Sequence, residues 1–199
     1  MSFKEKVIYQ IYPKSFLDTN QDGVGDLAGI KQKLPYLQQL GVDMIWLNPV
    51  YVSPQKDNGY DISDYKSVNP LFGSMEGLED LISAAQELKI DIMFDMVLNH
   101  VSTEHIWFQK ALAGEKKYQD YFILRDQPTD WVSKFGGNAW APFGDTGKYY
   151  LHLFDKTQAD LNWRNPDLRE ELYEVVRFWM DKGVKGFRFD VINLIGKDE

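Results

Sequence analysis

Short apolar segments alternate with segments of helical period along the chain. Residues 7–12, 42–47 and 90–95 are each rich in β-branched or aromatic side chains, and residues 186–191 form a fourth such segment. Strands that alternate with helices are typical of a parallel α/β sheet with right-handed crossovers. Periodicity alone does not decide between a small open sheet and half of an eight-stranded barrel.

The helical segments have readable ends. The first stops at Gly41, and Pro35 inside it predicts a kink or a late start. Its apolar face consists of Ile30, Leu34, Leu37 and Leu40. The second is predicted to begin at the N-cap Ser74, and a third at Asn165-Pro166. An aromatic-rich stretch without a clean period, residues 101–163, precedes the third, and insertions of this size usually carry binding loops.

Composition narrows the class of protein. The net charge is −8, which argues against a nucleic-acid partner, because such proteins present basic patches to phosphates. Cysteine is absent, so disulfides and thiolate metal sites are excluded for this sequence. The first residues do not read as a signal peptide, and no apolar run approaches the roughly 20 residues that cross a bilayer. We expect a cytoplasmic protein without a membrane partner.

The last strand carries a basic and an acidic residue on one face. Period-two alternation turns Gly186, Arg188 and Asp190 to the same side. A neighbouring guanidinium would keep Asp190 ionised, as a nucleophile requires. A purely structural ion pair explains the pattern equally well.

Polar residues also follow the third strand. Asp95 ends it, and Asn99 and His100 lie in the loop beyond. The carboxyl ends of barrel strands are where active sites collect. A lone histidine at such a position is also commonly a hydrogen-bonded structural residue.

Residues 18–26, the acidic loop, alternate oxygen-bearing side chains around a glycine turn, as a hard cation such as Ca²⁺ or Mg²⁺ needs. The predicted ligands are Asp18, Asn20, Asp22, Val24 and Asp26. An EF-hand is not indicated, because Gly29 stands at the twelfth position and a strand precedes the loop. The alternative is a metal-free loop of Asx turns.

Taken together, these motifs resemble the α-amylase superfamily of glycoside hydrolases (glycoside hydrolase family 13), in the branch of oligo-1,6-glucosidases and trehalose-6-phosphate hydrolases. The likeness covers nearly the whole chain and rests on residues 7–16, 18–26, 53–61, 95–100 and 186–190. It implies a TIM barrel with a B domain inserted after the third strand. The chain would then be the N-terminal half of the barrel, divided into residues 1–100, a B-domain insert at 101–163, and a barrel continuation at 164–199.

The resemblance also implies roles for individual residues. Asp190 would be the nucleophile and Arg188 would orient it. The glucosyl unit would be held by Asp57, Tyr60, Asp95, His100, Phe135, Phe154 and Gln158. For Phe135, Phe154 and Gln158 the alternative is a place in the core of the B domain. A structural Ca²⁺ or Mg²⁺ would occupy the acidic loop.

Retaining hydrolysis needs a second carboxyl group about 5 to 5.5 Å from the nucleophile. The family supplies this Glu after the fifth strand, beyond Glu199. We therefore expect a fragment that lacks turnover and needs the remainder of the barrel as its partner.

The substrate is expected to be a small sugar or sugar phosphate. Val191 after the nucleophile goes, in the resembling family, with α-1,6 or trehalose 6-phosphate cleavage, and residues 133–140, 149–163 and 191–197 favour the phosphorylated sugar. Lys14, Lys134 and Lys197 are candidate phosphate ligands, and for each the alternative is a solvated lysine. Two other functions stay open: an oligo-1,6-glucosidase, and a non-catalytic interaction protein on a glucosidase scaffold.

Overall fold

A computed structural model describes residues 2–197 of the 199-residue chain. The chain divides into two compact units, each assembled from segments that are far apart in the sequence. Unit 1 comprises Met1–Val52, Lys66–Met96 and Val175–Arg188, and unit 2 comprises Ser53–Tyr65, Val97–Glu174 and Phe189–Glu199.

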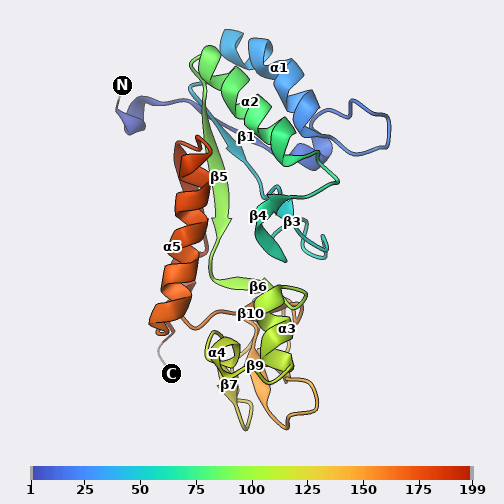
Figure 1. The fold of residues 1–199 in the computed structure, drawn as a ribbon, viewed down its shortest axis with the longest axis vertical. Coiled ribbons are helices and arrows are strands. Elements are labelled where there is room, and N and C mark those ends of the chain that lie inside the picture. The colour runs from blue at the N-terminus through green and yellow to red at the C-terminus, as the bar shows by residue number, and fades with distance from the viewer. Residues whose placement is uncertain (1, 198–199) are drawn as a thin grey trace. The chain divides into compact units, whose positions relative to one another are not determined.

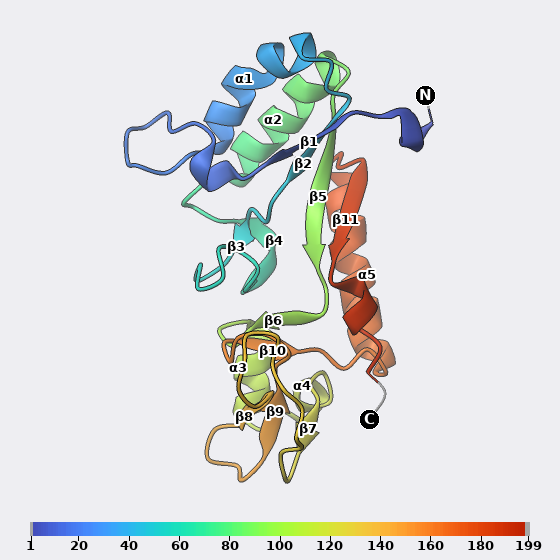
Figure 2. The same cartoon turned by 180° about the vertical axis from the view of Figure 1, so that it is seen from behind.

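Unit 1 is built on a sheet with the strand order β1-β2-β5-β11. These strands are β1 (Ile8–Ile11), β2 (Met44–Leu47), β5 (Asp91–Val97) and β11 (Gly186–Asp190). β1 and β2 pair in parallel, as do β2 and β5, so that Leu47 lies opposite both Ile11 and Phe94. β5 and β11 run side by side (Figure 2). The four predicted strands therefore form one sheet.

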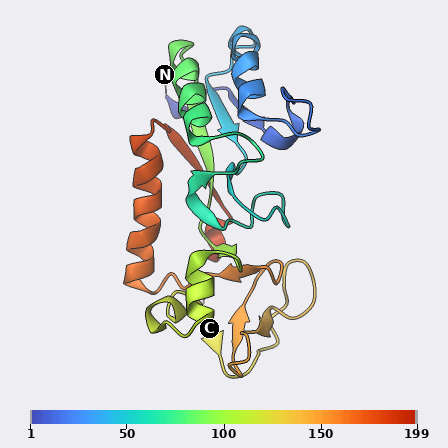
Figure 3. The ribbon, with the colours of Figure 1, turned by 45° about the vertical axis from the view of Figure 1, so that its right-hand side comes forward.

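Two helices pack against each other beside this sheet. α1 (Leu27–Gln39) and α2 (Met75–Glu87) lie side by side in both Figure 1 and Figure 3. Ser74 caps α2 as predicted, because its hydroxyl accepts a hydrogen bond from the Gly77 N–H. The predicted late start of the first helix is wrong, since α1 begins at Leu27 and continues through Pro35. Leu40 is 54% exposed rather than buried, because it follows the last helical residue.

The third predicted helix is α5 (Pro166–Asp181). The Asn165 side-chain carbonyl accepts hydrogen bonds from the backbone N–H groups of Asp167 at 2.8 Å and Leu168 at 3.1 Å, which makes it the N-cap. Toward the end of α5, the fully buried Trp179 ring packs against Phe94 at 4.9 Å between centroids. Residue Gly183 has a φ of +97°, a left-handed conformation that ends the helical segment.

Unit 2 contains shorter elements, which the sequence did not predict. β6 (His100–Ser102) pairs antiparallel with β10 (Gln158–Asp160), and β7 (Leu124–Arg125), β9 (Tyr149–Leu151) and β8 (Trp140–Pro142) form a second small sheet. Unit 2 also contains α3 (Ile106–Leu112) and α4 (Lys116–Gln119), whereas β3 (Tyr51–Val52) belongs to unit 1 and β4 (Asp64–Val68) has residues in both units. Strands of two or three residues have no readable period.

The domain boundaries at residues 100 and 163 remain a prediction; unit 2 contains the whole 101–163 segment and extends beyond it on both sides. The described residues also form the 3₁₀ turns η1 (Phe3–Glu5), η2 (Pro13–Ser15) and η3 (Ile192–Leu194). No helix within residues 2–197 combines the length and apolar character needed to cross a bilayer.

Candidate active site

A buried carboxylate lies at the carboxyl end of β5 in unit 1. Asp95 is fully buried and forms an ion pair with Arg188 of β11, whose Nη1 lies 3.0 Å from Oδ1 and 3.2 Å from Oδ2. The indole N–H of Trp46 donates to the same carboxylate at 3.1 Å. The guanidinium carbon of Arg188 stands 5.0 Å from the centre of the Trp46 ring, within cation–π range. Both the charge and the lone pairs of Asp95 are thus compensated.

The sequence predicted that Arg188 orients Asp190, and this role stays a prediction. The structure shows Arg188 paired with Asp95, a partner that alternation within one strand could not reveal, because Asp95 comes from a different strand. Trp46 was missed for the same reason: an apolar strand residue gives no sign in the sequence that its N–H will meet a carboxylate.

Unit 2 holds the buried polar network, which consists of Asp57, Asn99, His100, Gln158, Asp160 and Lys197. The Gln158 amide Nε2 donates to Asp57 Oδ2 at 2.8 Å and lies 3.3 Å from the Tyr60 carbonyl. Gln158 is fully buried on β10, next to β6, where His100 begins the strand. Three of the predicted glucosyl-binding residues, Asp57, His100 and Gln158, are therefore neighbours.

Both ring nitrogens of His100 have close polar neighbours. Nε2 lies 3.0 Å from the Tyr60 carbonyl oxygen and 3.2 Å from the Gln158 amide nitrogen, and Nδ1 lies 3.1 Å from the Asn99 side-chain nitrogen. These neighbours fix the position of the ring between β6 and β10. Burial lowers the pKa of His100 against the raising effect of nearby carboxylates, which agrees with a neutral ring.

Asp57 is positioned by a tight loop organised around Asp61. The buried Asp61 carboxylate accepts hydrogen bonds from the Ser53 hydroxyl and from the backbone N–H groups of Lys56 and Asp57, at 2.9 to 3.0 Å. Burial raises the pKa of Asp57, while the hydrogen bond from Gln158 opposes this shift. Asp61 was part of the motif at 53–61, but its organising role follows only from the structure.

The two predicted aromatic residues of the insert follow His100 in a row. The Phe154 ring lies 5.2 Å from the His100 ring, and Phe135 lies 5.7 Å from Phe154, both between centroids. Phe154 also packs against the apolar cluster of Ala139, Trp140, Leu151 and Leu153, whereas Phe135 is 61% exposed. Phe154 thus touches both the core and the polar network, and Phe135 offers an exposed ring.

Asp190 ends β11 and is followed by a strained residue. Val191 has φ 41° and ψ 35°, a left-handed conformation that is unusual for a β-branched side chain. Such strain concentrates at functional sites, where the surrounding structure holds it.

Asp160 and Lys197 form a second buried ion pair, which the sequence did not predict. Lys197 Nζ lies 3.1 Å from Asp160 Oδ2 and donates to Asn99 Oδ1 at 2.9 Å; the side chains of Lys197 and Asp160 are 5% and 0% exposed. The Asn99 amide nitrogen donates to Asp160 at 3.2 Å as well as meeting His100. Lys197 is therefore engaged inside the protein, which argues against its predicted role as a phosphate ligand.

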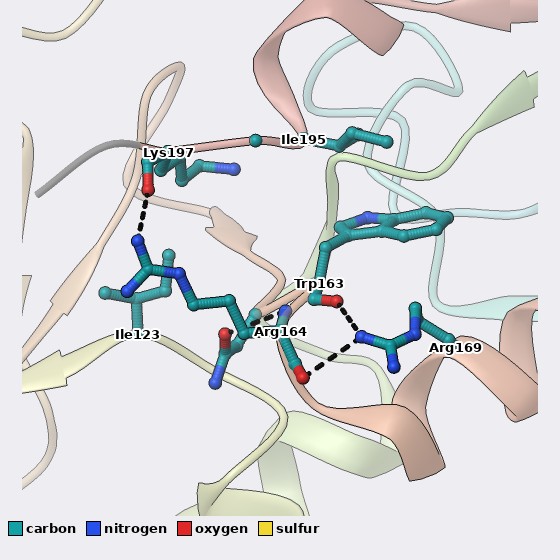
Figure 4. A pocket seen from close by; sticks show the side chains of 8 residues that line it. Ile123, Trp163, Arg164, Arg169, Ile195 and Lys197 are labelled. Atoms are coloured by element: carbon teal, nitrogen blue, oxygen red, sulfur yellow. Dashed lines mark hydrogen bonds between the residues drawn. The ribbon is translucent and has the colours of Figure 1, made fainter.

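A pocket of about 380 Å³ lies beside Lys197 (Figure 4). It is lined by Ile123, Asn162, Trp163, Arg164, Arg169, Ile195, Gly196 and Lys197. Arg164 donates to the Lys197 carbonyl at 3.0 Å, and Arg169 donates to the carbonyls of Trp163 and Arg164 at 2.8 and 3.1 Å. The pocket includes none of the predicted glucosyl-binding residues.

The acidic loop closes on itself through hydrogen bonds. Asp18 accepts from the N–H groups of Asn20, Gln21 and Gly23 at 3.1, 2.7 and 2.8 Å. Asp22 accepts from the Val24 N–H at 2.8 Å and the Asn20 amide at 2.9 Å.

The last predicted ligand, Asp26, caps α1 through the Gly29 N–H at 2.7 Å and binds Thr19. Burial alone would raise the pKa of Asp26, but the hydrogen bonds from Thr19 and Gly29 lower it. Among residues 2–197, no three His, Cys, Asp or Glu side chains are grouped to hold a metal ion. As arranged, the oxygen atoms face N–H groups, and a bound Ca²⁺ or Mg²⁺ stays a prediction.

Comparison with known proteins gives consistent matches. A trehalose-6-phosphate hydrolase of Bacillus subtilis is 52% identical over 204 residues, covering 99% of this chain and 36% of that protein. An oligo-1,6-glucosidase of Bacillus cereus is 50% identical over 203 residues, with the same two coverages. The crystal structure of Bacillus licheniformis trehalose-6-phosphate hydrolase matches with a TM-score of 0.96 and 52% identity, over 98% of this chain and 36% of that one.

The chain thus spans about 36% of the length of these relatives. The structural neighbours are TIM-barrel enzymes, so the predicted fold class, an N-terminal half of a (β/α)₈ barrel, is confirmed. The model of the α-amylase catalytic domain matches residues 10–199. The chain therefore belongs to the α-amylase catalytic-domain family.

Proposed function

We propose that the protein containing this chain is a retaining α-glucosidase that removes a terminal glucose, and that its substrate is trehalose 6-phosphate, cleaved to glucose and glucose 6-phosphate. The observation that carries the proposal is the buried polar network in a chain of this family. Asp57, His100 and Gln158 are brought together from positions 58 and 101 residues apart, and they present the polar groups that a sugar ring requires.

In the proposed reaction, the Asp190 carboxylate attacks the anomeric carbon and the glycosidic bond breaks, which leaves a glycosyl-enzyme ester. Asp57 accepts hydrogen bonds from glucose hydroxyl groups, and the neutral His100 ring, held at Nε2 by Tyr60 and Gln158, borders the bound sugar. Arg188 and Asp95 support the end of the sheet that carries Asp190. Phe135 and Phe154 offer apolar surface to the sugar.

In the first half-reaction the leaving oxygen needs an acid that protonates it as the glycosidic bond breaks. In the second half-reaction the same group, now a carboxylate, acts as the base that activates water to hydrolyse the ester. We assign this group to a carboxylate outside these 199 residues. The match to only 36% of the relatives' length supports that assignment.

The preference for trehalose 6-phosphate rests on Val191 and on the similarity to two trehalose-6-phosphate hydrolases, at 52% and 53% identity. Since Lys197 is engaged with Asp160, Lys14 and Lys134 are the remaining phosphate candidates among the predicted lysines. The second candidate function is oligo-1,6-glucosidase, favoured by relatives of that name at 50% and 51% identity. A non-catalytic role is disfavoured because Asp95, Arg188 and Asp190 are all present.

The proposal is tested on the full-length protein with trehalose 6-phosphate and isomaltose as substrates. We expect cleavage of the phosphorylated sugar, and Asp190→Asn should lower kcat by about 10⁴-fold or more, since the nucleophile is lost. Asp181→Asn, at an exposed carboxylate at the end of α5, is the matched control and should keep full activity.

Each outcome decides a separate point. Preference for isomaltose would move the assignment to oligo-1,6-glucosidase. Full activity of Asp190→Asn would remove Asp190 as the nucleophile, and absence of any glycosidase activity in the wild type would overturn the proposed function.

A further inference from the structure

Lys197 is a buried cation with its two ends held by different parts of unit 2. Its ammonium group is 3.1 Å from Asp160 and 2.9 Å from Asn99, in a side chain that is only 5% exposed. Its backbone carbonyl accepts the hydrogen bond from Arg164 at 3.0 Å (Figure 4). A buried lysine is costly unless paired, so these contacts restrict residue 197 to one position.

The segment between Asp190 and Lys197 is held in the middle by Leu194, which packs against the apolar cluster of Ala139, Trp140, Leu151 and Leu153. It begins with the left-handed Val191, φ 41°, and continues through η3. The turn is closed by the Leu194 N–H to the Val191 carbonyl at 2.9 Å and by a long bond of 3.5 Å from Ile195 to Ile192. A strained residue next to Asp190 persists only if the segment is anchored beyond it.

The same contacts reach the predicted sugar-binding residue His100. Asn99 uses its oxygen for Lys197, and its amide nitrogen meets both Asp160 and His100 Nδ1. Asp160 in turn accepts from the Leu153 N–H at 2.9 Å, next to Phe154. The buried ammonium group of Lys197 therefore links the segment that follows Asp190 to Asn99, the residue that contacts the His100 ring.

We propose that Lys197 is a positioning residue of the candidate active site: clamped by Asp160 and Asn99, it holds residues 191–197 so that the Asp190 carboxylate keeps its attacking position relative to a glucosyl unit bound at His100. This inference rests on the proposed function. Lys197 does not touch the reacting atoms and acts through the chain that it anchors.

The test uses the full-length enzyme and an aryl α-glucoside with a good leaving group, for which departure needs little acid assistance. Lys197→Met removes the charge and keeps the length of the side chain. We expect kcat per titrated active site to fall about 100-fold, the scale of a misplaced reacting group, with KM changed less than about threefold. Lys197→Arg keeps the cation and should recover part of the loss.

Two further variants guard against a folding defect. Arg164→Ala removes only the bond to the Lys197 carbonyl from an exposed side chain, and kcat should fall several-fold with unchanged KM. Lys116→Met is the matched control, because this lysine is 80% exposed and pairs only with Asp120 among the described ion pairs of residues 2–197. It should leave kcat and KM unchanged.

Hydrogen exchange of residues 191–197 adds a readout that does not depend on turnover. Faster exchange in Lys197→Met together with the drop in kcat supports the proposal. An active wild type whose Lys197→Met variant keeps its kcat, or loses activity only through KM, would overturn it. A wild type without glycosidase activity would instead be a failure of the proposed function.

Discussion

The acidic loop and the buried polar network both gather carboxylate and amide groups, but they satisfy them over different distances in the sequence. In the acidic loop, the partners of Asp18 are two, three and five residues away, and all three hydrogen bonds are exposed to solvent. In the network, Asp160 meets Asn99 across 61 residues, Lys197 meets Asn99 across 98, and Gln158 meets Asp57 across 101.

This difference determines what each region contributes. The loop uses neutral N–H donors close to solvent. After the loss of one carboxylate, these N–H groups can donate hydrogen bonds to water instead. The network places a full charge pair on side chains that are only 5% and 0% exposed, so loss of one partner leaves a buried, uncompensated charge. We therefore expect stability to depend strongly on the network and weakly on most carboxylates of the loop.

Asp160→Asn is expected to have the largest effect on stability and therefore tests most sharply whether the network matters more than the loop. The variant keeps an oxygen for the Leu153 N–H but leaves the Lys197 ammonium buried without its counter-charge. Removal of one partner of a buried pair costs about 3–5 kcal/mol, and we expect a loss of that size in the free energy of unfolding. Urea unfolding of wild type and variant under the same conditions measures it.

A double variant separates the charge from the shape. Asp160→Asn combined with Lys197→Met removes both charges, and the protein should be more stable than with Asp160→Asn alone. Two results would contradict the view that the network is held by a buried ion pair. One is a double variant whose loss in the free energy of unfolding equals that of Asp160→Asn or is the sum of the two single losses. The other is a loss below about 1 kcal/mol in Asp160→Asn itself.

The elements that the sequence predicted well are those set by local chemistry. The four strands of the sheet, the Ser74 cap and the Asn165 cap follow from short patterns that act within one turn or one strand. Leu40 was misplaced because the apolar period continued past the last residue of α1. The small strands of unit 2 form only through long-range pairing, and their sequences carry no period.

The candidate site shows the same division. Motifs identified Asp57, His100, Gln158 and Asp190 as a set, but only through resemblance to a family. Asp160 and Trp46 were missed, and Lys197 was predicted as a phosphate ligand rather than as the partner of a buried ion pair, since an Asp or a Lys is ordinarily solvated and a strand tryptophan is ordinarily core. Their partners become neighbours only when distant segments fold together, and nothing within a window of a few residues encodes that.

A second prediction extends the comparison to a buried histidine outside the network. His105 is 4% exposed, packs against Tyr65 and Trp107, and accepts the Trp107 N–H at Nδ1. Burial lowers its pKa from 6.5 to about 4. The folded protein therefore keeps the ring neutral while the unfolded chain takes up a proton, so its contribution is present above pH 6.5 and is lost as the pH falls toward 4.

We expect this group to remove about 3 kcal/mol of stability between pH 7 and pH 4. His105 is the N-cap of α3. His105→Asn offers an amide oxygen as the cap without a titrating ring, so the stability of the variant should decline less over the same interval. The difference between the two pH profiles, measured by urea unfolding, cancels the contribution of His100. Parallel profiles would show that His105 titrates normally.

The smallest effects belong to the acidic loop, where two carboxylates of the same loop differ in their partners. Asp26→Ala removes the cap of α1 and should cost about 1 kcal/mol, the usual value for a lost N-cap. Asp22→Ala, at an exposed residue with local partners, should cost less than about 0.5 kcal/mol in the absence of divalent cations.

Calcium separates the two explanations of the motif: a cation bound by the predicted ligands raises Tm in the wild type by mass action and fails to do so in Asp22→Ala. The contrary result is a Tm that changes with neither calcium nor chelator, while Asp26→Ala still loses the stability that the N-cap contributes. In that case the oxygen atoms of residues 18–26 stabilise the turn and the start of α1, and the predicted metal site is wrong.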